Sequence, residues 1–344
     1  MASGLLIVPQ PPCGPGRFFE VAGRRGPAVR AVAVGQFRAP PETMDLPDPV
    51  AGPDDLLVRV EFAGMNPLDW KIADGIYEGH RPHVFPLVLG VDACGTVESA
   101  GPRSQRFRRG DRVVGQFLHD PVGRGTYAEL ALVPERLGIV RVPDEVPSDG
   151  AAALPTAGMT AMAAVDALDL ETGSMVVIAG ASGGIGSFAT QIAVARGFRV
   201  VALARPASAA RLRSLGAAEV IDPTAPEVLS LVAGSHPTGC DGLLDTMSDR
   251  AGLARLAGLV RPGGVAVSTT FSADPRALGA SKVRAVNIDL HPDATLMERL
   301  LREVTEHHLR IPLERRVDLS GAPAALAELK AGHGRGKTVV QLPS

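Results

Sequence analysis

A glycine-rich turn at residues 180–186, GASGGIG, constrains the fold of this chain more than any other segment. It stands between an apolar run at 175–179 and an apolar stretch at 188–195, and a second apolar run follows at 199–204. This order predicts a strand, a tight turn, a helix and a parallel strand. Glycines in the turn let a diphosphate approach the first amides of the helix, where the helix dipole attracts an anion. We therefore predict a dinucleotide site, formed by Gly180, Ser182, Gly183, Gly184, Ile185 and Gly186.

The residues after the second predicted strand indicate which dinucleotide binds. A site for NAD carries an acidic residue about 20 positions beyond the first glycine, where it binds the ribose 2′-hydroxyl. Here the strand runs into Arg205, and no Asp or Glu is nearby. The arginine fork matches the oxygens of a 2′-phosphate, and Ser208 and Arg211 stand where they could assist. We predict NADPH as the cofactor in preference to NADH.

Composition narrows the remaining possibilities. A chain of 344 residues favours two domains, and 45% hydrophobic with 21% charged residues is typical of a soluble globular protein. A formal net charge of −2 gives no sign of a nucleic-acid or membrane partner. The three cysteines are far apart, which argues against a cysteine zinc cluster and favours a reducing, cytoplasmic location. We interpret the proline-rich residues 1–28 as a flexible N-terminal extension.

The pattern after residue 28 predicts two kinds of structure. Short strands separated by glycine and proline predict a β-barrel-like domain over 29–149. A helix is predicted over 150–168, followed by the strands of a parallel sheet as far as about residue 290. An amphipathic helix over 295–308 and a final strand over 336–342 complete the chain, and we expect that strand to return to the first domain. The fold class is therefore α/β, with a doubly wound parallel sheet beside a β-barrel.

Several short motifs occur in an order that is known from one superfamily. They are NPLDWK at 66–71, FPLVLGVDACG at 85–95, GDRV at 110–113, TYAE at 126–129, AALP at 152–155, GMTA at 158–161 and GK at 336–337. With them the chain resembles the medium-chain dehydrogenase/reductase superfamily, in its zinc-independent quinone oxidoreductase and enoyl reductase branch. The resemblance implies a GroES-like catalytic domain at 29–149 and 295–344 and a Rossmann NADPH-binding domain at 150–294. It also implies a homodimer, with edge-strand pairing near residues 284–288.

The chain departs from the zinc alcohol dehydrogenases of that superfamily. Those enzymes have a cysteine ligand near the position of Asn66 and a Gly-His-Glu segment where this chain has Gly90-Val91-Asp92. A catalytic zinc site needs about three nitrogen, sulfur or carboxylate ligands and an open position. Because the thiolate and the imidazole are both replaced, we predict that this chain holds no metal.

Without zinc, the simpler reaction is hydride delivery to a carbon that is already electrophilic, as in an enone, an enoyl thioester or a quinone. Hydrogen-bond donors must then stand where negative charge develops. The resemblance implies Asn66 and Tyr77 as donors, with Tyr77 as the preferred proton donor, and Thr160 beside the nicotinamide. Lys71 either holds a carboxylate or thioester oxygen or faces solvent. Lys337, in the Gly-Lys motif, is assigned to cofactor binding together with Thr160.

Three functions remain open at this point. The first is an NADPH-dependent reductase of activated C=C bonds or quinones, with a possible place in secondary metabolism. The second is a redox-neutral tailoring enzyme on the same fold, such as a cyclase. The third is a noncatalytic NADPH-binding protein. The glycine turn indicates a retained cofactor in all three, so turnover of NADPH is the observation that separates them.

Overall fold

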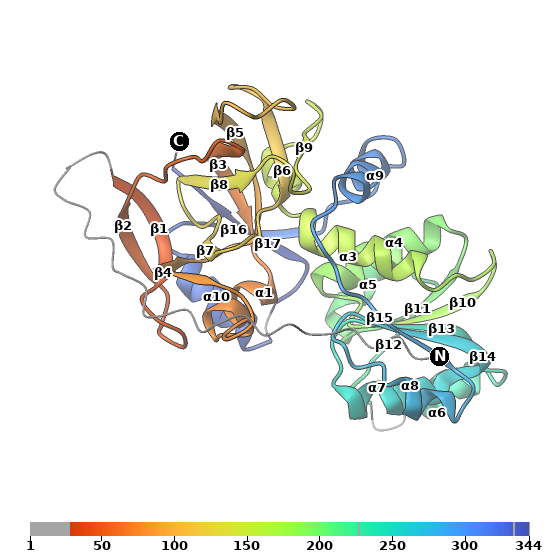
Figure 1. Cartoon of the computed structure of the whole chain (residues 1–344). Helices are drawn as coiled ribbons and strands as arrows, with labels where there is room; N and C mark the ends of the chain where they lie inside the picture. The colour runs from red at the N-terminus through yellow and green to blue at the C-terminus, as the bar shows by residue number, and fades with distance from the viewer. Residues whose placement is uncertain (1–27, 226–227, 333, 344) are drawn as a thin grey trace, which may run out of the picture.

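The computed structural model describes residues 28–225, 228–332 and 334–343. Of the expected N-terminal extension over 1–28, residues 1–27 lie outside the described residues. Figure 1 shows two parts side by side, one built from mainly antiparallel sheets and the other from a parallel sheet between helices. The fold is that of a GroES-like domain joined to a Rossmann-like domain, as the sequence predicted.

The first part contains two sheets. In the larger one the strand order is β16-β17-β3-β5-β6-β9, with β8 paired to β3, and in the smaller one it is β2-β1-β4-β7. The bounds are β1 Ala28–Val34, β2 Glu42–Pro47, β3 Asp55–Gly64, β4 His83–Val88, β5 Asp92–Ala100, β6 Arg112–Gln116, β7 Val122–Arg124, β8 Leu130–Pro134, β9 Val140–Arg141, β16 Leu313–Asp318 and β17 Lys337–Gln341. Strand β17 pairs antiparallel with β3, so the end of the chain returns to the first domain as predicted.

The second part is a six-stranded parallel sheet in the order β12-β11-β10-β13-β14-β15, the order of a Rossmann fold. The bounds are β10 Met175–Ala179, β11 Arg199–Leu203, β12 Glu219–Ile221, β13 Cys240–Asp245, β14 Val260–Ser268 and β15 Arg284–Asn287. Alternate residues of β10 face opposite sides of the sheet: Val176 and Ile178 join one hydrophobic core, and Val177 and Ala179 join another. Burial on both faces explains why these strands are continuous apolar runs in the sequence.

Helices pack against the sheets of both parts. Their bounds are α1 Pro67–Ala73, α2 Ser148–Ala152, α3 Pro155–Asp166, α4 Gly184–Ala195, α5 Ala209–Ser214, α6 Val228–Ser235, α7 Arg250–Leu256, α8 Pro275–Gly279, α9 Ala294–Thr305 and α10 Ala322–Lys330, with short 3₁₀ helices at Pro206–Ser208 and Ala257–Leu259. Helix α3 packs against α4 and α9, whereas α1 packs against α10. In Figure 1, α3 and α9 lie on the side of the Rossmann-like sheet that faces the first domain.

The single helix predicted over 150–168 is wrong, because the structure has two helices, α2 and α3, with a break at Ala153 and Leu154. Pro155 begins α3 and carries no N–H to donate to the preceding turn, so it can start a helix but cannot continue one. The break matters for the site because it places Thr156 in the first turn of α3, where its backbone N–H is free to bind a side chain.

Candidate active site

The glycine turn joins β10 to α4, and its glycines have different structural roles. Gly180 has a φ of +75°, and a Cβ at Gly186 would overlap the carbonyl oxygen of Gly180. Both positions therefore require glycine for the fold itself. Gly183 caps α4 in an extended conformation, and a Cβ there would meet nothing closer than 3.4 Å. The space above Gly183, at the positive end of a twelve-residue helix, suits an approaching diphosphate.

The three residues predicted to select NADPH differ in their surroundings. Arg205 is exposed, directly after the end of β11, and Ser208 is buried in the turn that follows. Arg211 lies against the glycine turn, because its guanidinium donates to the Ser182 carbonyl oxygen at 2.8 Å and to Ser187 Oγ at 3.0 Å. Of the two arginines, Arg205 therefore has the freer guanidinium for a 2′-phosphate, while Arg211 supports the turn.

Lys337 connects the catalytic domain to the glycine turn. The backbone N–H of the preceding residue, Gly336, donates to the Ser182 carbonyl oxygen at 3.1 Å. The Lys337 side chain is only 3% exposed, and a Cβ at Gly184 would lie 3.0 Å from its Cδ, so the side chain lies against the glycine turn. Its Nζ donates to Asn66 Oδ1 at 2.6 Å and to the Met65 carbonyl oxygen at 2.8 Å. Burial lowers the pKa of Lys337, and the nearby carboxyl groups of Asp92 and Asp69 oppose that effect.

Asp92 is the centre of a buried hydrogen-bond network that joins the two domains. Its carboxylate accepts bonds from Asn66 Nδ2 at 2.8 Å, from the Thr156 N–H at 3.0 Å and from Thr156 Oγ1 at 2.6 Å. Gln116 Nε2 donates to Thr156 Oγ1 at 2.7 Å. Burial raises the pKa of Asp92, while the charge of Lys337 and the three donors lower it. We take Asp92 as the ionised partner of Lys337.

Asp69 of α1 belongs to the same network through Asn66. Its Oδ2 accepts a bond from the Asn66 backbone N–H at 2.7 Å, which fixes the start of α1, and another from the Tyr127 hydroxyl at 2.7 Å. Complete burial raises the pKa of Asp69 to about 7, against the opposing effect of those two bonds. The same burial, with the charge of Asp69, raises the pKa of Tyr127 well above its ordinary value, so its hydroxyl remains a donor.

The residues predicted to be catalytic are only partly brought together. Both amide hydrogens of Asn66 are engaged, with Asp92 Oδ2 and with the Gly64 carbonyl oxygen. Thr160 lies one turn beyond Thr156 on α3 and donates to its carbonyl oxygen at 2.6 Å. Tyr77 is half-buried, with the Arg81 guanidinium 5.1 Å from its ring centroid. Lys71 Nζ lies 5.7 Å from the Trp70 ring centroid, which Lys330 of α10 also approaches. The roles of all four stay predictions.

Sequence reasoning did not find three members of the network, namely Gln116, Tyr127 and Thr156. Their contacts depend on tertiary structure, because Tyr127 and Thr156 donate to buried carboxylates from distant segments and Gln116 donates to Thr156. The one available signal was Asp92, a charged residue inside the apolar strand segment VDACGTV. A buried carboxylate requires donors and a cation, so it indicates a network without naming the partners.

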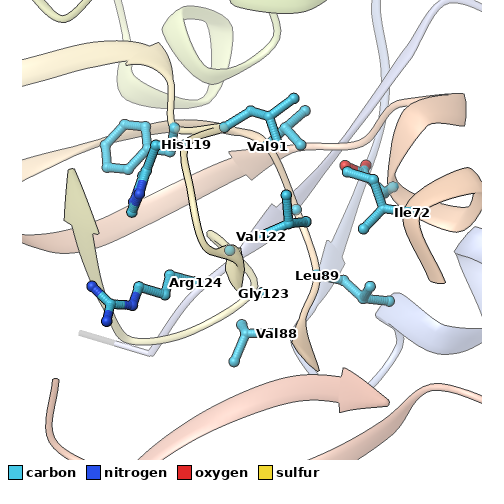
Figure 2. Close-up of a pocket in the computed structure, with 13 residues that line it drawn as sticks. Ile72, Val88, Leu89, Val91, His119, Val122, Gly123 and Arg124 are labelled. Atoms are coloured by element: carbon cyan, nitrogen blue, oxygen red, sulfur yellow. The ribbon is translucent and has the colours of Figure 1, made fainter. Parts of the chain in front are cut away.

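A small cavity lies beside Asp69. Its wall is formed by Ile72 of α1, residues 88–91 between the end of β4 and the start of β5, residues 117–119 after β6, and residues 122–125 around β7. Figure 2 shows Ile72 and Leu89 on one side and His119 and Arg124 on the other. Within the described ranges, no three His, Cys, Asp or Glu side chains group as metal ligands do, and no helix is long and apolar enough to cross a membrane.

Comparison with known proteins places this geometry in a family. The alcohol dehydrogenase GroES-like domain family matches residues 52–144, and the zinc-binding dehydrogenase family matches residues 215–340. A chloroplastic quinone-oxidoreductase homolog of Spinacia oleracea is 31% identical over 309 residues, which cover 86% of this chain and 92% of that protein. The trans-enoyl reductase himH of Aspergillus japonicus is 35% identical over 211 residues, or 56% of this chain and 60% of that protein.

The structural comparison agrees with the sequence comparison. The quinone oxidoreductase of Coxiella burnetii superposes with a TM-score of 0.82 at 27% identity, covering 92% of this chain and all of that one. The quinone-oxidoreductase homolog and the Coxiella burnetii structure each match over most of this chain. The chain therefore belongs to the medium-chain dehydrogenase/reductase superfamily, in the branch of quinone oxidoreductases and enoyl reductases, whose members are oxidoreductases that use a nicotinamide cofactor.

Proposed function

We propose that this chain is an NADPH-dependent reductase that delivers hydride, without a metal, to an activated C=C bond of an enone or enoyl thioester, or to a quinone. The observation that carries the proposal is the buried network of Asn66, Asp92 and Lys337. By the resemblance, Asn66 stands near the position of a cysteine ligand in the zinc alcohol dehydrogenases, and the carboxylate of Asp92 already accepts bonds from protein donors. A substrate that needs no Lewis acid suits such a site.

The chain's residues then have distinct tasks. Bound NADPH would supply the hydride, held by the space above Gly183 and by Arg205 at the 2′-phosphate. Asn66 orients Lys337, because its Oδ1 accepts a hydrogen bond from Nζ. Both amide hydrogens of Asn66 are engaged within the protein. Tyr77 is our candidate proton donor, and Thr160 is our candidate contact with the nicotinamide. The position of Lys71 over Trp70, beside α10, favours the solvent-facing alternative for that side chain.

The test is anaerobic oxidation of NADPH with a simple quinone, an alkyl enone and an enoyl thioester in parallel. Transfer of deuterium from labelled NADPH to the β-carbon of the enone or thioester would establish C=C reduction, and activity with the quinone alone would restrict the proposal to quinones. Tight NADPH binding without oxidation by any acceptor would refute the reductase and favour a redox-neutral or noncatalytic role.

We also propose a cytoplasmic homodimer. The free outer edge of β15 supports pairing between subunits at residues 284–288, and the buried free thiols of Cys94 and Cys240 are compatible with a reducing compartment. Light scattering after gel filtration would measure the mass, and a monomer would refute the assembly.

A further inference from the structure

One buried carboxyl oxygen beside the site has no hydrogen-bond partner among the residues that the structure describes. Asp69 is fully buried, and both of its hydrogen bonds, from the Asn66 N–H and the Tyr127 hydroxyl, go to Oδ2. Its Oδ1 is buried and unpartnered. A buried polar atom without a partner costs about 1–3 kcal/mol, and such atoms are commonly satisfied by ordered water. The residues around Oδ1 should therefore leave room for a hydrogen-bond partner such as a water molecule.

Asp69 lines the small cavity of Figure 2, whose free volume of about 20 Å³ is enough for one water molecule. Most of the lining is apolar, including Leu89, Val91 and Phe117. The glycines at 90, 123 and 125 also line it, and they can contribute only backbone atoms. A buried water molecule needs two to four polar partners. Peptide groups that can serve as such partners therefore line the cavity beside the Asp69 carboxyl.

The charges around Asp69 determine its protonation state. The groups that face it are the Tyr127 hydroxyl, the Asp92 carboxylate and the Lys337 ammonium group, and His119 and Arg124 stand in the cavity wall. Among the residues that the structure describes, Lys337 supplies the ammonium group that acts on both buried carboxyls, and Asp92 already accepts three hydrogen bonds. Asp69 accepts two bonds on one oxygen and none on the other. The excess negative charge is therefore relieved most easily by a proton on Oδ1 of Asp69.

We propose that Asp69 acts as a positioning residue in its carboxylic acid form, holding Asn66 through one oxygen and donating a hydrogen bond from the other to a water molecule in the cavity. Through Asn66 it fixes the side chain that binds Lys337 and Asp92. When Asp69 loses its proton, a second negative charge stands beside this network and the donor to the cavity water is lost. The raised pKa of Asp69, about 7, is consistent with this assignment.

Asp69→Asn reproduces the acid form at every pH, because the amide oxygen accepts the two bonds and the NH₂ group donates into the cavity. In the wild type, kcat/KM for NADPH oxidation should fall up to tenfold per pH unit above the inflection, and in Asp69→Asn that fall should be absent. Tyr127→Phe removes a donor that favours the ionised carboxylate, so its inflection should move to higher pH. An unchanged profile in both variants would overturn the positioning role.

The pH profile of kcat/KM rests on the proposed function, because it requires turnover of NADPH. Infrared spectroscopy detects the protonated carboxyl of Asp69 without turnover. Infrared difference spectra of wild type against Asp69→Asn should show the carbonyl stretch of a protonated carboxylic acid at about pH 6, with its loss at about pH 9. Absence of that band at pH 6 overturns the inference whatever the activity. A band that titrates in a protein that oxidises no NADPH would confirm the acid form of Asp69 while the reductase proposal fails.

Discussion

Replacement of Lys337 by methionine tests whether the buried network joins the two domains. The substitution removes the Nζ bonds to Asn66 and Met65 and leaves the Asp92 and Asp69 carboxyls without a buried cation. Lys337 Nζ donates to two neutral oxygens, and each buried acceptor left without its donor costs about 1–3 kcal/mol. Methionine fills most of the lysine volume, so little of the loss comes from a cavity. Against a typical stability of about 5–15 kcal/mol, this loss is large and easily measured.

The pH dependence of that loss identifies its cause. Lys337 lowers the pKa of Asp92, which burial raises, so removing the lysine raises the pKa of Asp92 further. A carboxyl whose pKa is raised in the folded state destabilises the fold most above that pKa, and the penalty fades as pH falls toward the unfolded value of 3.8. Lys337→Met should therefore lose less stability at about pH 5 than at about pH 8. Adding Asp92→Asn should restore about 2 kcal/mol or more at pH 8.

The assay is denaturant unfolding followed by the fluorescence of Trp70, the single tryptophan of the chain, which lies on α1 next to the network. The reasoning is refuted if Lys337→Met loses the same stability at both pH values and the double variant recovers none of it. That result would mean that the lysine contributes packing rather than charge.

Three further substitutions separate folding from cofactor binding and chemistry. Gly183→Ala should fold normally and bind NADPH at least about tenfold more weakly, whereas Gly186→Ala should unfold more easily, because its Cβ overlaps a backbone oxygen; equal thermal stability of the two would contradict this. Arg205→Asp should weaken NADPH binding by about 10–100-fold and spare NADH, with Arg213→Asp, an exposed arginine on α5, as the control. Tyr77→Phe should lower kcat about tenfold or more, and an unchanged rate would move proton donation elsewhere.

The parts of the fold that local chemistry determines could be predicted from the sequence. The unit β10–α4–β11 follows from two apolar runs and a glycine turn, and its parallel register is observed. Strand β16 was not predicted, because its sequence LERRVD carries four charged residues and is mostly exposed. What makes it a strand is its parallel pairing with β17. Helix α1 was missed as well, since seven residues are too few for a clear helical period.

In the site too, contiguous segments could be predicted from the sequence, but contacts between distant residues could not. The glycine turn is contiguous in sequence, whereas Lys337 and Asn66 are 271 positions apart and meet only because β17 returns to β3. Which of two buried carboxyls holds a proton also depends on donors from three separate segments, at Asn66, Tyr127 and Thr156. The sequence could therefore predict a departure from the zinc-binding pattern near Asn66, but not the contacts that Asn66 makes. In the structure, Asn66 links Lys337 to Asp92, and this network joins α3 of one domain to β5 and β17 of the other. Because that network joins the two domains, a substitution that disturbs its charge should change stability and activity together.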